Sequence, residues 1–210
     1  GEGGDELFAG YGRYRRALRP AWLGGRPAEP RGASPGVLAA WREAARPPRD
    51  VTSLQAAQWA DIMTWLPNDL LLKLDRCLMA HGLEGRTPFL DREVAAFAFG
   101  LPDRFKVRGG QGKWLLRKWL ERACPAARPW ARKQGFTVPV EAWIAPRAAD
   151  IAQRIGRIEA VRQVLGDEAA GRMAVPGRRW PLLFFAVWAL IHLEGAQPKD
   201  ALAALTGDAG

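Results

Sequence analysis

Apolar residues recur at the three- and four-residue spacing of α-helices along most of this 210-residue chain. No segment shows the sustained alternation of apolar and polar residues that marks a half-buried strand. Proline and glycine divide the helical pattern into short pieces. The chain as given is therefore predicted to be mainly α-helical, and its hydrophobic content of 48% is enough to build a core.

Several helix boundaries follow from residues that begin or end helices. We expect a first helix from Asp5, which can cap it, to about Ala17. Pro67 divides the next long pattern into two helices, with Asn68 capping the second and Gly82 ending it. Further helices are predicted over residues 37–45, 92–100 and 113–124, and in two or three pieces of the C-terminal part.

Charge, cysteines and hydropathy narrow the possible partners and compartments. The formal net charge is +9, but the arginines form no dense block and no basic–aromatic repeat, so no nucleic-acid partner is expected. Cys77 and Cys124 lie far apart, which predicts no metal-ligand cluster and favours a reducing cytoplasm. The apolar run from Trp180 to Leu193 is shorter than the ~20 residues of a membrane span and is predicted to be a buried core helix.

The run GEGGDELFAGY (residues 1–11) places two carboxylates, Glu2 and Asp5, among glycines. Glycines allow tight turns and close approach of a ligand, and a turn that leads into a helix directs N–H groups at an anion. Carboxylates beside a phosphate would repel it unless a hard cation such as Mg²⁺ bound both. A plain surface turn with an N-cap aspartate is the alternative.

Charged residues gather again in KLDRCLMAHGLEGRTPFLD (residues 73–91), around Phe89 and Leu90, which we expect in the core. Structural ion pairs explain such a cluster, and so does a polar substrate pocket. The candidates for the pocket are Asp75, Arg76, Glu84 and Arg86.

A third stretch, RKQGFTVP (residues 132–139), holds Lys133 two residues before Gly135. By itself this is an ordinary loop lysine. Beside a polyphosphate it becomes a point charge directed at negative charge that develops on phosphorus.

These stretches, together with GKWLLRKWLERACP (residues 112–125), occur in the order found in the glutamine-hydrolysing asparagine synthase family, which the chain resembles. The resemblance covers most of the chain to about Ile144, and residues 180–193 resemble that family's closing helix more loosely. We therefore expect residues 1–195 to be the C-terminal part of the synthetase domain and residues 196–210 to be a disordered tail.

The resemblance implies a fold and a reaction. The fold is an α/β PP-loop ATP pyrophosphatase domain (adenine nucleotide α-hydrolase-like), of which this helical chain would be the C-terminal portion. In the reaction, ATP activates the side-chain carboxylate of aspartate as an acyl-adenylate, and ammonia from glutamine then displaces AMP. The implied cofactors are ATP and Mg²⁺, the implied partners are small-molecule substrates, and the parent enzyme would be a homodimer.

The resemblance also implies roles for individual residues. Asp5 would share Mg²⁺ with the nucleotide phosphates, and Glu2 would be the base that takes a proton from ammonia. Lys133 would stabilise the pentavalent phosphorus during activation. Backbone N–H groups of the turn would contact the nucleotide, at Gly1, Glu2, Gly3 and Gly4. The substrate would be held by Asp75, Arg76, Glu84 and Arg86.

Two family features have no copy in this sequence, the SGGxDS pyrophosphate loop and the N-terminal catalytic cysteine. We therefore expect a fragment of a larger enzyme that is inactive alone. Two other readings stay open. One is a related amidotransferase or natural-product cyclase that acts on another carboxylate. The other is a noncatalytic helical binding module, which would tolerate alanine at Glu2, Asp5 and Lys133.

Overall fold

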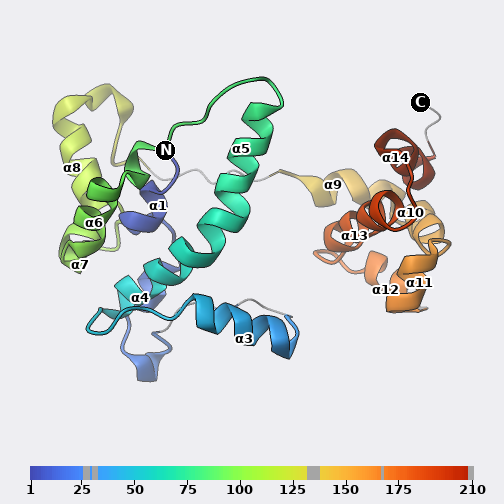
Figure 1. Cartoon of the computed structure of the whole chain (residues 1–210), viewed down its shortest axis with the longest axis horizontal. Coiled ribbons are helices and arrows are strands. Elements are labelled where there is room, and N and C mark those ends of the chain that lie inside the picture. The colour runs from blue at the N-terminus through green and yellow to red at the C-terminus, as the bar shows by residue number, and fades with distance from the viewer. Residues whose placement is uncertain (26–28, 30–32, 132–137, 167, 208–210) are drawn as a thin grey trace. The chain divides into compact units, whose positions relative to one another are not determined.

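The computed structural model describes residues 1–25, 29, 33–131, 138–166 and 168–207 (Figure 1). Within these residues every regular element is a helix, and the only β-type pairing is an isolated bridge between Arg108 and Gln111. The prediction of a mainly helical chain is thus confirmed. The chain divides into two compact units, Gly1–Arg132 and Lys133–Gly210, so a division falls inside the segment 1–195 that was predicted as one domain.

The first unit contains helices throughout its described length. They are α1 (Gly4–Leu7), α2 (Tyr14–Ala17), η1 (Ala21–Leu23), α3 (Pro35–Ala44), α4 (Ser53–Ala60), η2 (Asp61–Leu71), α5 (Leu72–Met79), η3 (Pro88–Leu90), α6 (Arg92–Gly100), α7 (Asp103–Lys106), α8 (Trp114–Ala123) and η4 (Pro125–Ala127). The helices predicted over 37–45, 92–100 and 113–124 are confirmed as α3, α6 and α8.

The first predicted helix is wrong in its length and in its cap. α1 has only four residues, and Gly3 rather than Asp5 stands at its N-cap. Ala9 then takes a left-handed conformation with φ +56°, and the N–H of Gly10 donates to the Asp5 carbonyl at 2.7 Å. The chain therefore turns back before α2 begins, and Asp5 lies in the first turn of α1 rather than at its N-cap.

The predicted division at Pro67 is also wrong, because α4, η2 and α5 follow one another without a break (Figure 1). η2 is a π-helix, a wider helix whose hydrogen bonds run from residue i to i+5, and Pro67 lies inside it. The Asn68 side chain donates to the Thr64 carbonyl at 2.8 Å, and the Thr64 hydroxyl donates to the Ala60 carbonyl at 2.5 Å. Asn68 therefore supports the π-helix from its side and caps nothing.

The predicted end of the long helix at Gly82 is confirmed. Gly82 has φ +66°, its N–H donates to the Met79 carbonyl at 3.0 Å, and the N–H of Leu83 donates to the Leu78 carbonyl at 3.1 Å. These two bonds form a Schellman motif, whose left-handed residue is most often glycine.

The second unit contains the remaining described helices. They are α9 (Val140–Ile144), η5 (Ala145–Arg147), α10 (Ala148–Ile155), α11 (Glu159–Leu165), α12 (Glu168–Ala174), α13 (Arg179–His192) and α14 (Pro198–Thr206). α13 carries the long apolar run, and one face of it is buried through Leu182, Ala186 and Ala189. The opposite face is not, because Trp180 and Phe184 are 48% and 62% exposed. The predicted core helix is thus buried on one side only.

The disordered tail predicted over 196–210 is wrong for residues 198–206. These residues form α14, and its Ala201 and Leu205 are 0% and 1% exposed. Leu205 belongs to the second unit's core, and its burial there holds the helix in place. None of the helices in the described part of the chain is both long and apolar enough to cross a lipid bilayer.

Candidate functional site

The acidic glycine turn, residues 1–5, is a tight turn that leads into α1, as the sequence predicted. Gly3 has φ +82°, and its carbonyl accepts from the N–H of Leu7 at 2.9 Å. A Cβ added at Gly3 would lie 2.3 Å from Cδ2 of Leu90. Leu90 and Phe89 are half-buried against this turn and belong to the core around Leu7, which bears out their predicted place. The glycine is therefore required both for its backbone conformation and for packing.

Asp5 forms an ion pair that the sequence analysis did not foresee. Its Oδ2 lies 3.0 Å from Nζ of Lys113, and the two side chains are only 23% and 29% exposed. Lys113 immediately precedes α8 and holds a left-handed conformation, φ +55°, which costs a non-glycine residue energy. The lysine falls within the GKWLLRKWLERACP motif, but no local pattern indicates that its ammonium reaches Asp5.

Two glycines allow this ion pair to form. A Cβ at Gly10 would lie 1.8 Å from Oδ1 of Asp5 and 2.5 Å from Cε of Lys113. A Cβ at Gly112 would lie 2.1 Å from the Ala9 carbonyl oxygen. The N–H of Lys113 donates to the Phe8 carbonyl at 2.8 Å, so the two backbone segments are in direct contact. Any side chain at either glycine would push the lysine and the carboxylate apart.

Gly112→Ala is expected to lower the free energy of unfolding by about 2 kcal/mol or more, because its Cβ must displace backbone rather than a flexible side chain. Urea denaturation followed by circular dichroism measures this change. Gly36→Ala is the matched control, since Gly36 lies in α3 with nothing within 4 Å of an added Cβ, and alanine there should be neutral or stabilising. Equal stabilities for the two variants would contradict the close backbone contact.

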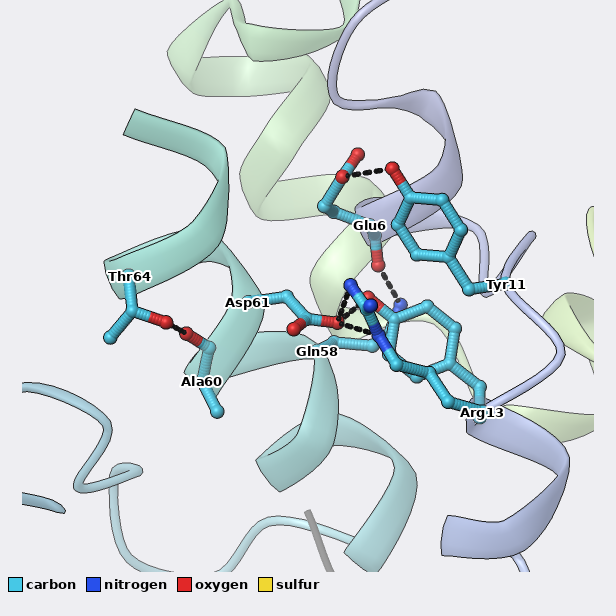
Figure 2. A network of polar contacts seen from close by, with 8 residues as sticks. Glu6, Tyr11, Arg13, Gln58, Ala60, Asp61 and Thr64 are labelled. Atoms are coloured by element: carbon cyan, nitrogen blue, oxygen red, sulfur yellow. Dashed lines mark hydrogen bonds and ion pairs between the residues drawn. The ribbon is translucent and has the colours of Figure 1, made fainter. Parts of the chain in front are cut away.

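A buried polar network joins α1, the helix that follows the acidic glycine turn, to α4 (Figure 2). Glu6 is 1% exposed, and its Oε1 accepts from the Tyr11 hydroxyl at 2.7 Å. The amide of Gln58 on α4 donates to the carbonyls of Glu6 and Leu7, at 2.6 and 2.7 Å. Burial raises the pKa of Glu6, and the hydrogen bond from Tyr11 opposes that rise. α1 is thus fixed to α4 through its main chain.

A second part of the network joins α2 to η2. The Tyr14 hydroxyl donates to Oδ2 of Asp61 at 2.5 Å. Nη2 of Arg13 lies 2.9 Å from the same oxygen, and Figure 2 shows Arg13 and Asp61 facing each other. The Arg13 guanidinium also covers the Tyr11 ring, 4.4 Å from its centroid. Burial is the main cause of a raised pKa for Tyr14. Tyr11 and Tyr14 fall within the segment that was predicted as one helix from Asp5 to about Ala17, and no local pattern there indicates this network.

A cavity of about 480 Å³ lies between α3 and η2. Trp41 and Trp65 line it, together with Arg13 and Asp61, which are already paired with each other. Neither Glu2 nor Asp5 belongs to its wall. The cavity therefore gives no support to the predicted nucleotide site.

The four charged residues predicted to form a substrate pocket are exposed. Glu84 and Arg86 approach to 3.5 Å with side chains 74% and 82% exposed, and no ion pair among the described residues joins them to Asp75 or Arg76. The loop does lie along α5, because a Cβ at Gly85 would meet the side chains of Leu78 and Leu74. The structure therefore brings the loop and the helix together without enclosing a pocket from these four side chains.

The structure describes the predicted site residues of the acidic glycine turn but not the predicted loop lysine. Glu2 is half-buried and Gly1 is exposed, both in the acidic glycine turn with Asp5. Lys133 lies outside the described residues. Among the described residues, no group of three or more histidine, cysteine, aspartate or glutamate side chains is placed to hold a metal ion by itself.

Comparison with known proteins gives consistent matches. A family model described as "Asparagine synthase" matches residues 1–190. The "Asparagine synthetase [glutamine-hydrolyzing] 1" of Bacillus subtilis is 29% identical over 96% of this chain and 43% of its own length. A "Putative asparagine synthetase [glutamine-hydrolyzing]" of Mycobacterium tuberculosis is 36% identical over 65% of this chain and 22% of its own length. The chain thus spans less than half the length of these curated relatives, and no solved structure matches it.

Proposed function

The chain belongs to the asparagine synthase family, and on that premise we propose that the protein containing it is an ATP-dependent carbon–nitrogen ligase of asparagine synthetase type. The reaction would join aspartate to ammonia from glutamine, through a β-aspartyl-adenylate, with release of AMP and pyrophosphate. The observation that carries this proposal is the family match over residues 1–190, which includes the acidic glycine turn at its start.

The fold proposed for the whole protein is an α/β PP-loop ATP pyrophosphatase domain, with this helical chain as its C-terminal portion. The helix α5 supports it, because none of its residues is buried and Leu72 and Met79 are 45% and 56% exposed. A helix with an apolar face needs a partner surface, and in α/β domains a sheet supplies it.

Asp5 suits the proposed role of magnesium ligand in its chemistry. Carboxylate oxygens are the hard donors that Mg²⁺ prefers, and the ion commonly uses one or two carboxylates together with water and phosphate oxygens. When bound, Mg²⁺ would neutralise charge on the phosphates of ATP. The ammonium of Lys113 orients the Asp5 carboxylate at 3.0 Å and adds positive charge at the same place.

The other proposed roles belong to groups on the same turn and to the loop lysine. Backbone N–H groups of Gly1, Glu2, Gly3 and Gly4 would contact the nucleotide, and the carboxylate of Glu2 would take a proton from the attacking ammonia. Lys133 would offset charge that develops on phosphorus. A substrate with two carboxylates and one ammonium suits the mixed charges proposed to hold it, on Asp75, Arg76, Glu84 and Arg86.

The test uses the full-length gene product with aspartate, glutamine and Mg²⁺-ATP. Equal amounts of AMP, pyrophosphate and asparagine are expected. AMP release with another carboxylic acid, but none with aspartate, would indicate a related amidotransferase or cyclase. The noncatalytic binding module would be indicated if no acid caused AMP release and if the protein kept its function with alanine at Glu2, Asp5 and Lys133.

A further inference from the structure

Lys106 is a buried cation with no role in the proposed chemistry. The residue is 0% exposed at the end of α7, and its Nζ donates to the Phe99 carbonyl at 2.8 Å and to Oε1 of Gln58 at 2.9 Å. No ion pair joins it to any described carboxylate. Burying a lysine without one is costly unless its donors are satisfied. The site offsets part of the cost of burying the ammonium, because Phe99 lies in the last turn of α6, where the helix dipole favours a cation.

Lys106 determines which way the amide of Gln58 faces. An ammonium has donors only, so the amide must present its oxygen to Lys106 and its nitrogen to the opposite side. On that side Nε2 donates to the carbonyls of Glu6 and Leu7. Gln58 is itself 0% exposed, so no bulk solvent competes for these bonds. Burial lowers the pKa of Lys106 to about 8, which leaves the ammonium as the main form at neutral pH.

We propose that Lys106 and Gln58 are positioning residues for the acidic glycine turn, and that Lys106 acts on it through the orientation of the Gln58 amide. The carbonyl of Glu6 directly follows Asp5 in the chain, so fixing it fixes the carboxylate against Lys113. This role rests on the proposed function of Asp5 and Glu2, because Gln58 contacts the residues that directly follow the turn and neither Gln58 nor Lys106 is proposed to touch the substrate.

Hydrogen exchange in the full-length protein tests the positioning without any need for activity. The amides of Leu7, Phe8 and Gly10 report on the turn, since each donates to a carbonyl of residues 3–5. Lys106→Met and Gln58→Met should each raise their exchange rates about 10-fold, and the double variant should exchange no faster than the faster single variant. Leu54→Ala, which empties a buried site on α4 in the core shared with Tyr14 and removes no hydrogen bond of the network, is the control for general destabilisation.

Kinetics provide a readout that loss of stability alone would not move. Each variant should lower kcat of adenylation about 10-fold and leave KM for aspartate within about 2-fold, whereas Leu54→Ala should keep wild-type kcat. Gln58→Glu should behave like Gln58→Met, because a carboxylate accepts from Lys106 but cannot donate to the two carbonyls.

Unchanged exchange at these amides in Lys106→Met, or exchange and kcat effects that simply add in the double variant, would overturn the positioning role. So would wild-type protection in Gln58→Glu. If the wild-type protein shows no adenylation, the proposed ligase function fails, and the exchange rates still decide whether Lys106 and Gln58 hold the turn.

Discussion

Asp5→Asn should slow adenylation of the substrate carboxylate by at least about 100-fold in the full-length protein. Asparagine keeps the shape of the side chain and removes its charge, so it loses both the proposed hold on Mg²⁺ and the ion pair with Lys113. ATP–pyrophosphate exchange measures the step directly, because it depends on formation of the adenylate and not on ammonia.

Asp150→Asn is the control for this variant. Asp150 lies on α10 in the second unit, in an exposed ion pair with Arg154 at 3.2 Å. Loss of this ion pair should leave the rate of ATP–pyrophosphate exchange unchanged. A wild-type rate of ATP–pyrophosphate exchange in Asp5→Asn would show that Asp5 is not part of the nucleotide site. A matching far-ultraviolet circular dichroism spectrum shows that the variant has folded.

Glu2→Gln should separate the two half-reactions. Glutamine cannot take a proton, so transfer to ammonia should fall by about 100-fold or more, while ATP–pyrophosphate exchange stays near the wild-type rate. Asparagine formation and pyrophosphate exchange are measured on the same preparation. Hydroxylamine, a nucleophile that is unprotonated at neutral pH, should restore product formation in the variant because it needs no base.

Two outcomes would contradict the role of Glu2 as a base. An equal fall in both half-reactions would place Glu2 in nucleotide binding, and no fall in either would give it no role. Glu168→Gln on α12 is the control, since Glu168 forms an exposed ion pair with Arg172 at 2.9 Å that should not influence either step.

Local sequence signals predicted the features that local interactions determine. Gly82 ends its helix because only the two bonds of a Schellman motif and a left-handed residue are needed there. The tight turn before α1 follows from glycines that lie next to one another in the sequence. The π-helix was not predicted, because a proline normally ends a helix and apolar spacing does not distinguish i+4 from i+5 hydrogen bonding.

The contacts that shape the candidate site are not local, and no sequence pattern contains them. The partners Asp5 and Lys113 are joined only by folding, and so are Gln58 and Lys106, which are 48 residues apart. α14 was missed because its alanines are weak hydrophobic signals, whereas its order depends on how the second unit buries Ala201 and Leu205. Tertiary packing, not propensity, decides these features.

The proposed reaction requires the acidic glycine turn to bind ATP through Mg²⁺. Isothermal titration of the full-length protein with a nonhydrolysable ATP analogue, with and without Mg²⁺, tests it most directly. Removing Mg²⁺ is expected to weaken wild-type binding at least about 10-fold, and Asp5→Asn should bind equally weakly in both conditions. An Asp5→Asn protein that binds the analogue with the wild-type affinity and the wild-type dependence on Mg²⁺ would contradict this requirement.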